Sequence, residues 1–279
     1  MTKQSEILKD SRYVPIHNGG FVGLLDVMGS DETIERAARV SYGKGTRQSS
    51  DTRSLLRYLI RHHHTSPTEF GEVILHVKLP IFVARQWMRH RTFSYNETSL
   101  RYSEAESEYY IPTEDYVQMQ STKNKQGREG QISNSKDFLE DQKLATDYIF
   151  DVYNSDIKDG ISRELARINL PTSLYTEFYC KVDLNNLMRF LKLRMDSHAQ
   201  MEIQDYARAI YNLVKPRFPI IFEAFDDYVL NAATFSKNEM NILQQLIDNS
   251  TNIDSIISSS GLLSKREKEE FYAKLKKSI

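Results

Sequence analysis

Residues 72–79 limit most strongly what this chain can fold into. Every second residue there is aliphatic, so an extended strand would have one continuous apolar face. These aliphatic residues are Val73, Leu75, Val77 and Leu79. Pro80 follows directly and suits the first turn of a helix, where its missing N–H is not needed. The segment therefore predicts a half-buried strand that leads straight into a helix.

Strand and helix patterns mix irregularly along the rest of the chain. Strand patterns occur at 21–28 and 174–182, and helical patterns at 30–38, 55–64, 138–153, 163–169, 185–195 and 200–214. Ser30 is a candidate helix cap, Gly160 a helix end, and residues 113–134 a long polar surface loop. Because no regular βαβ repeat is present, we predict an α+β fold with a mixed sheet flanked by helices. We expect one domain over 1–230 and a helical C-terminal extension over 231–279.

Charge and cysteine content exclude several classes of protein. The net charge of −1 gives no overall field that would attract nucleic acid or anionic lipid. No apolar run approaches the ~20 residues that cross a bilayer. The single cysteine, Cys180, rules out an internal disulfide and agrees with a reducing compartment. We expect a cytoplasmic protein with no membrane or nucleic-acid partner.

Basic residues concentrate between positions 81 and 103, in a chain that is otherwise balanced in charge. Arg85 and Arg89 stand four residues apart and would share one face of the helix that Pro80 starts. Like charges at this spacing repel, and a phosphate bound by the guanidinium groups would relieve the repulsion. A solvated basic patch paired with surface carboxylates is the alternative explanation.

Residues 89–101 read RHRTFSYNETSLR. This segment resembles the defining motif of the flavin-dependent thymidylate synthases, R-H-R-x-x-S-x-N-x-x-S-x-R, at every fixed position. Further similar segments lie at 20–22, 26–28, 36–41, 80–87, 101–103 and 193–200, so the resemblance covers roughly residues 20–229. It implies reductive methylation of dUMP to dTMP with FAD as cofactor. It also implies 5,10-methylenetetrahydrofolate as carbon donor, NADPH as reductant, and a homotetramer with active sites at subunit interfaces.

The resemblance assigns roles to individual residues. Those implied in FAD binding are Ser66, Glu69, Arg89, His90, Arg91, Asn96, Glu97, Asp183, Asn185 and Arg189. Those implied in dUMP binding are Gln86, Arg89, Glu97, Thr98, Ser99, Leu100, Arg101, Arg167 and Arg194. Two are implied in catalysis: Arg194, which would favour ionisation at uracil N3, and His64, which would lie near the flavin and the folate.

The sequence departs from the family pattern just after the strand predicted at 174–182. Where the family often has Asn and Arg, this chain has Asp183 and Asn185. An acidic side chain close to the FAD phosphates would be repulsive, and Arg189, further along the predicted helix, would supply the missing positive charge. We therefore expect Arg189 to matter more for FAD than for dUMP.

Two other chemistries are considered. His62, His63 and His64 invite a metal site, but neighbouring residues on one helix point in different directions, so we expect none. Cys180, between Tyr179 and Lys181 on an alternating strand, is best explained as a core residue and not as a nucleophile. The flavin route needs no cysteine thiolate.

Two further readings stay open at this point. A nucleic-acid-binding protein could use the arginine cluster and the sixteen tyrosines for phosphate contact and stacking. A catalytically silent family member could act as a scaffold, an idea to which the departures at Asp183 and Asn185 add some weight.

Overall fold

The computed structural model describes residues 6–41, 51–122 and 125–238, and in the C-terminal part 240, 243, 255, 257–258, 261 and 263–276. The chain divides into two compact units, Met1–Leu230 and Asn231–Ile279. Much of the predicted extension lies outside the described residues, and its described part includes helix α12 (Lys265–Lys276). None of the described helices is both long and apolar enough to span a membrane.

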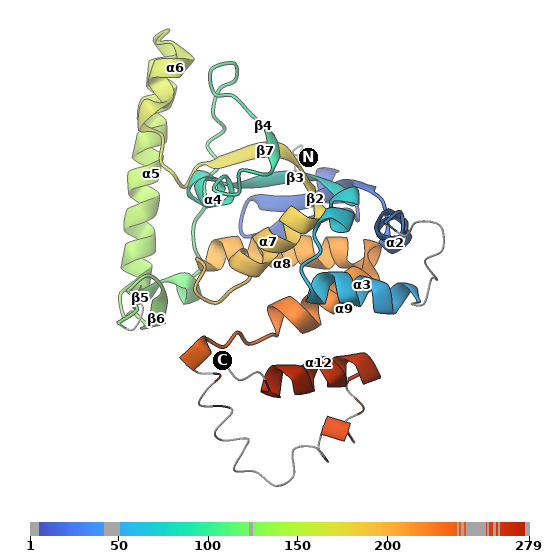
Figure 1. Ribbon diagram of the computed structural model, residues 1–279. Helices are drawn as coiled ribbons and strands as arrows, with labels where there is room; N and C mark the ends of the chain where they lie inside the picture. Colours follow the sequence, from blue (N-terminus) through green and yellow to red (C-terminus); the bar gives the residue numbers. More distant parts are fainter. Residues whose placement is uncertain are drawn as a thin grey trace. The chain divides into compact units, whose positions relative to one another are not determined.

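A five-stranded sheet organises the first unit (Figure 1). Its order is β1 (Tyr13–Ile16), β2 (Gly20–Met28), β3 (Glu72–Pro80), β7 (Tyr175–Asp183) and β4 (Ser94–Glu97). The predicted α+β class is confirmed. Every pairing is antiparallel, so the sheet is not mixed as expected. Two parallel neighbouring strands must be joined by a segment that crosses from one end of the sheet to the other. In this sheet, the chain leaves one strand and enters its neighbour at the same end, so the two strands run antiparallel.

The central strand β3 is buried on both faces over much of its length. Its apolar face has no exposed surface, as predicted, and consists of Val73, Leu75, Val77 and Leu79. On the other face, His76 is held by the Tyr13 hydroxyl at 2.9 Å from Nδ1 and by a Glu177 oxygen at 2.7 Å from Nε2. Lys78 forms an ion pair with Glu108. These partners satisfy polar groups whose burial would otherwise be costly.

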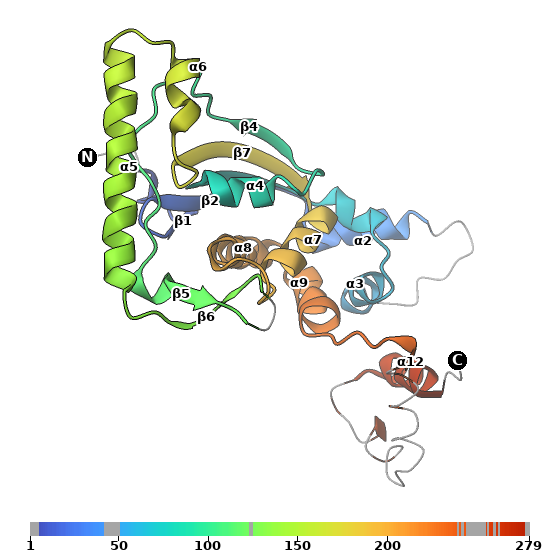
Figure 2. The ribbon, with the colours of Figure 1, turned by 90° about the vertical axis from the view of Figure 1, so that its left-hand side faces the viewer.

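Helices cover the apolar face of the sheet (Figure 2). They are α4 (Ile81–Trp87), α7 (Leu184–Arg194) and α8 (Met201–Val214), with α2 (Asp31–Arg39), α3 (Thr52–Arg61) and α9 (Pro219–Phe225) alongside. Trp87 lies 4.7 Å from the Phe190 ring, and both side chains are fully buried. Burying a large apolar side chain contributes about 1.5–3 kcal/mol, so this layer holds α4 and α7 against the sheet.

Two helix ends follow the local sequence signals. The Ser30 hydroxyl caps α2 by accepting from the Thr33 N–H at 3.4 Å. Helix α5 (Ser135–Lys158) ends in a Schellman turn, with Gly160 at φ +83°. The helices predicted at 185–195 and 200–214 are confirmed, and the one at 163–169 is α6 (Arg163–Ala166) followed by the 3-10 turn η3 (Arg167–Asn169).

Helix α3 ends earlier than predicted. It stops at Arg61 and does not run through the histidines. The His64 N–H donates to the Leu59 carbonyl at 2.9 Å and the His63 N–H to the Ile60 carbonyl at 3.2 Å, which is the bond pattern of a Schellman turn. His63 takes its left-handed position at φ 56°, where glycine is usual. The 3-10 helix η1 (Ser66–Phe70) follows.

The region predicted as a long loop contains its own structure. The 3-10 turn η2 (Glu114–Tyr116) leads into a hairpin of β5 (Gln118–Gln120) and β6 (Arg128–Gln131). The Arg128 guanidinium binds both oxygens of the buried Glu202 at 2.6 Å, and the Tyr110 hydroxyl donates to the same carboxylate at 3.0 Å. These contacts with α8 are distant in sequence, which is why the polar composition did not reveal the hairpin.

Candidate active site

Arg194 and His90 meet where α7 ends and the basic segment at 89–101 begins. The Arg194 Nε donates to Nε2 of His90 at 3.0 Å, and an Arg194 terminal nitrogen donates to the Gln86 carbonyl at 2.9 Å. Arg194 is half-buried, and burial lowers the pKa of its guanidinium. Arginine nevertheless stays charged in proteins. The described structure therefore gives Arg194 neutral acceptors and no carboxylate.

His90 is held in its neutral form. Burial lowers the pKa of the imidazole to about 4, with further lowering by the charges of Arg194 and Arg189. Because a guanidinium can only donate, Nε2 of His90 must be the acceptor, so the ring proton is on Nδ1. The ring also packs edge-on against Phe190 at 4.9 Å. His90 thus orients Arg194 without neutralising it.

Gln86, on the last turn of α4, has a second contact in this cluster. Its amide nitrogen donates to the Gln200 side-chain oxygen at 2.5 Å. Gln200 precedes the first residue of α8 as its N-cap position. The predicted substrate residue Gln86 is thereby connected to α7 through Arg194 and to α8 through Gln200.

The predicted shared helical face of Arg85 and Arg89 is wrong, because α4 ends at Trp87. Arg85, Arg89 and Arg91 are exposed. Within the described residues, none of the three side chains forms a hydrogen bond or an ion pair. Their charges are available for a ligand or for another subunit.

Aromatic residues pack the middle of the motif, around β4, against the sheet. Phe93 is buried and stacks at 5.9 Å on Tyr95, whose hydroxyl donates to the Trp87 and His90 carbonyls. Tyr95 pairs with Cys180 in the register of β4 and β7. The alternation of the strand then leaves Asn96 on the opposite face, exposed at the edge of the sheet.

A cavity of about 420 Å³ brings together four of the predicted dUMP residues, Glu97, Thr98, Leu100 and Arg167. Its other charged lining residues are Lys78, Glu104, Glu106, Glu108 and Glu177. Carboxylates thus outnumber cations in the wall that one chain provides. A phosphate dianion would need further positive charge to bind here.

Two predicted phosphate-binding residues do not line this cavity. Arg101 is exposed and forms an ion pair with Glu164 at 3.0 Å. The Ser99 hydroxyl accepts from the Arg101 backbone N–H at 3.3 Å. Exposed ion pairs contribute little stability, typically below about 1 kcal/mol, so Arg101 can exchange Glu164 for a ligand at small cost.

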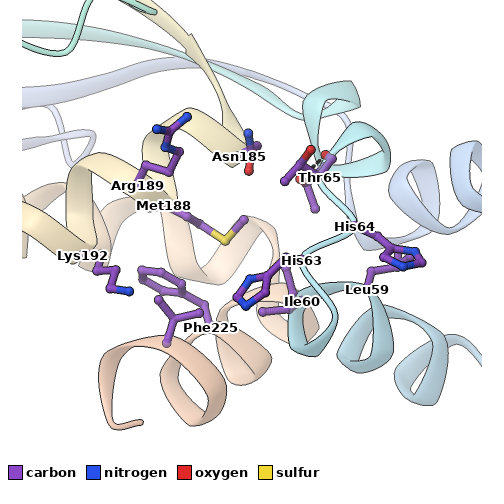
Figure 3. A pocket seen from close by; sticks show the side chains of 12 residues that line it. Leu59, Ile60, His63, His64, Thr65, Asn185, Met188, Arg189, Lys192 and Phe225 are labelled. Atoms are coloured by element: carbon purple, nitrogen blue, oxygen red, sulfur yellow. Dashed lines mark hydrogen bonds between the residues drawn. The ribbon is translucent and has the colours of Figure 1, made fainter. Parts of the chain in front are cut away.

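A separate pocket of about 170 Å³ lies between the end of α3 and α7 (Figure 3). It contains three predicted residues, His64, Asn185 and Arg189. The remaining lining residues are Leu59, Ile60, His63, Thr65, Thr68, Met188, Lys192, Phe225 and Val229. This wall combines basic and amide side chains with an apolar surface, and none of the described residues that line it is a carboxylate.

Ser66, Glu69 and Asp183 lie outside both cavities. Ser66 and Glu69 are exposed on η1. Asp183 is the N-cap of α7, and its carboxylate accepts from the Asn186 backbone N–H at 2.9 Å and from the Asn186 amide at 2.6 Å. Its negative charge is therefore engaged at a helix N-terminus, where it is stabilising.

Sequence reasoning missed several lining residues. Lys192 follows Arg189 by three positions, and this helical spacing was a usable signal. His63 was missed because the three histidines were expected to continue the helix. Its side chain lines the pocket because the Schellman turn after Arg61 changes the direction of the chain. Thr65 and Thr68 carry no sequence signal of a site.

Cys180 is 2% exposed, and burial raises the pKa of its thiol. A buried thiol that resists ionisation is a poor nucleophile. The described residues also contain no group of three His, Cys, Asp or Glu side chains that could hold a metal ion.

Comparison with known proteins identifies related sequences and folds. The family described as "Thymidylate synthase complementing protein" matches residues 23–220. A flavin-dependent thymidylate synthase of Ehrlichia ruminantium is 47% identical over 230 residues, covering 82% of this chain and 77% of its own. One from Thermus thermophilus is 44% identical over 256 residues, covering 92% and 93%. A crystal structure of a UMP/dUMP methylase from Streptomyces cacaoi, bound with 5-Br dUMP, is 30% identical with a TM-score of 0.70, covering 78% of this chain and 99% of that one.

Proposed function

The chain belongs to the flavin-dependent thymidylate synthase family, and from this we propose which residues, co-substrates and assembly it uses to methylate dUMP to dTMP. We infer FAD as the flavin, 5,10-methylenetetrahydrofolate as the carbon donor and NADPH as the reductant. The single cysteine suits a reducing compartment, so we also propose the cytoplasm as its location.

The observation that carries the catalytic proposal is the environment of Arg194. Its guanidinium is half-buried and donates to the neutral Nε2 of His90 and to the Gln86 carbonyl. A cation that no carboxylate neutralises stabilises negative charge that develops on a bound uracil ring. Because burial strengthens this interaction and His90 fixes the direction of the guanidinium, no reorganisation is needed during the reaction.

We assign dUMP binding to the motif and to the cavity next to it. Glu97, Thr98, Leu100 and Arg167 line that cavity. Ser99 and Arg101 are sequence neighbours of the lining residue Leu100, and the Gln86 carbonyl accepts a hydrogen bond from Arg194. Arg101 would leave Glu164 to bind the phosphate, because a guanidinium forms a stronger, bidentate contact with phosphate in a less hydrated site.

The pocket between α3 and α7 fits the flavin cofactor. Its polar wall offers Arg189, the Asn185 amide and His64, the rest of the wall is largely apolar, and no carboxylate is among its described lining residues. Such a donor set suits a phosphate-bearing aromatic ligand. When bound, FAD supplies the hydride, and the chain orients and shields the reacting groups.

We propose a homotetramer whose active sites combine several chains. Carboxylates outnumber cations among the charged residues of the cavity next to the motif, whereas Arg85, Arg89 and Arg91 are exposed and unpaired within the described residues. Motif arginines from a second copy would supply the missing positive charge. Exposed apolar side chains on and after α5 offer a contact surface, namely Leu144, Tyr148, Leu165 and Ile168.

The test is an absorbance spectrum of the purified protein, followed by product analysis with dUMP, NADPH and methylenetetrahydrofolate. We expect flavin bands and formation of dTMP, with NADPH oxidation accelerated by dUMP. Arg194→Met is expected to retain the flavin and to lose dTMP formation. A wild-type protein that takes up FAD but leaves dUMP unmethylated would contradict the catalytic assignment, and the mass of the folded protein in solution tests the tetramer.

A further inference from the structure

We propose that Lys192 and His63, together with Arg189, form a subsite for a dinucleotide diphosphate in the pocket between α3 and α7. The inference rests on the proposed function, because it names the part of the ligand that this pocket binds. Neither Lys192 nor His63 belongs to the residues that the resemblance to the family assigns to FAD. The sources of such a diphosphate are the flavin dinucleotide and the nicotinamide dinucleotide, which share this chemistry.

Two cationic side chains of the subsite, those of Arg189 and Lys192, come from α7. Arg189 and Lys192 are three residues apart on α7, line the same pocket and are exposed. Within the described part of the chain, neither forms a hydrogen bond or an ion pair. Like charges at this spacing are destabilising by a few tenths of a kcal/mol, and an anion between them would reverse that cost.

His63 reaches the pocket from the opposite wall through an unusual backbone conformation (Figure 3). It occupies the left-handed position of the turn that ends α3, at φ 56°. A residue other than glycine pays about 1–2 kcal/mol in this conformation. Such strain concentrates at ligand sites, and here it places an imidazole opposite the ammonium group of Lys192.

The rest of the pocket suits the groups next to a diphosphate. Thr65, Thr68 and Asn185 provide neutral polar side chains, and the apolar wall consists of Leu59, Ile60, Met188, Phe225 and Val229. An apolar wall lowers the local dielectric and strengthens charge-assisted hydrogen bonds. In Figure 3 the charged ends of Arg189 and Lys192 point in different directions, which suits two linked phosphates better than one.

The closing experiment uses the holoenzyme and three variants. Lys192→Met removes the charge, Lys192→Arg keeps it, and His63→Asn keeps a side chain that tolerates the left-handed conformation. Lys181→Met is the matched control, because Lys181 is exposed on β7 and is paired with Glu72 at 2.7 Å. Flavin fluorescence on dilution gives the Kd for FAD, and initial rates with FAD saturating give the KM for NADPH.

We expect Lys192→Met and His63→Asn to raise the Kd for FAD about tenfold to a hundredfold, as loss of a charge-assisted hydrogen bond predicts. Lys192→Arg and Lys181→Met should stay near wild type, and added salt should weaken FAD binding less in Lys192→Met than in wild type. An unchanged Kd for FAD with a raised KM for NADPH would assign the subsite to the nicotinamide dinucleotide. If neither constant changes, the inference is overturned while the proposed function stands. A wild type that binds neither dinucleotide would remove both.

Discussion

The Arg194 guanidinium donates through Nε to Nε2 of His90 at 3.0 Å, across 104 residues of sequence. Because the imidazole can accept only through a nitrogen without a proton, the pair requires neutral His90. A carboxylate in the same place would orient Arg194 equally well but would cancel its charge. The pairing therefore positions a cation and leaves its charge available to the substrate.

Replacing Arg194 with Met should lower kcat about 10²–10³-fold, the usual cost of losing one preorganised group that stabilises developing charge. The Kd for FAD should change little. Steady-state dTMP formation and flavin retention are the measurements, with Arg12→Met as the control, since Arg12 is an exposed residue paired with Asp10. A variant that loses flavin in proportion to activity would show that Arg194 acts through cofactor binding instead.

The stability of the protein should depend on pH through His90. Its pKa is lowered from 6.5 to about 4 in the folded state, so between these values the unfolded chain binds more protons. Neutral His90 therefore makes its full contribution to the unfolding free energy above pH 6.5. As the pH falls toward 4, the unfolding free energy decreases by up to about 3 kcal/mol. Urea unfolding at pH 7 and pH 5 measures this decrease over most of the range. His90→Gln should flatten this part of the profile, and an unchanged profile would place the dependence elsewhere.

Arg189→Ala should weaken FAD binding about tenfold and dUMP binding less than twofold, because Arg189 lines the pocket between α3 and α7 and not the dUMP cavity. Arg217→Ala, at an exposed position on the 3-10 turn η4 (Lys215–Arg217), is the control. Fluorescence titration with each ligand decides the matter, and equal retention of FAD by the Arg189 variant would remove the assignment.

Asp183→Ala should lower the unfolding free energy by about 1 kcal/mol, since it removes the cap of α7. Asp183→Asn should retain most of the stability because the amide oxygen can still accept from the Asn186 N–H. Both variants should keep the flavin. A loss of flavin in Asp183→Ala at unchanged melting temperature would show that Asp183 contacts the cofactor after all.

Arg128→Leu should destabilise the protein by about 3–5 kcal/mol, because it leaves the Glu202 carboxylate buried without its cation. Burial by itself raises the pKa of Glu202, and the hydrogen bonds and charge of Arg128 more than offset this and lower it. Adding Glu202→Leu to Arg128→Leu should recover much of the loss. Denaturant unfolding of Arg128→Leu, Glu202→Leu and the double variant completes the double-mutant cycle. If Arg128→Leu alone were as stable as wild type, the role of this pair would be contradicted.

Much of the fold could be predicted because its signals are local. The alternation at Val73, Leu75, Val77 and Leu79 identified the central strand, and Ser30 and Gly160 identified helix ends. The family motif from Arg89 to Arg101 led directly to the enzyme class. In each case the physical cause lies within a few residues of its effect, so that the pattern can be read without the rest of the molecule.

The errors have other causes. The hairpin around Arg128 depends on a contact with Glu202 that is distant in sequence. The end of α3 at Arg61 depends on the left-handed conformation of His63, which this residue type does not signal. The paired residues that define the site, Arg194 with His90 and Gln86 with Gln200, are separated by more than a hundred positions.

The sequence by itself therefore determined the class of fold, the order of most helices and strands, and the chemistry, because periodicity, caps and the motif are properties of short segments. The tertiary structure alone decided which charges stay unpaired, that Asp183 caps a helix, and that Lys192 and His63 line one pocket. Packing between distant segments sets the distances, the burial and therefore the strength of these electrostatic interactions, and none of these is a property of a segment considered alone.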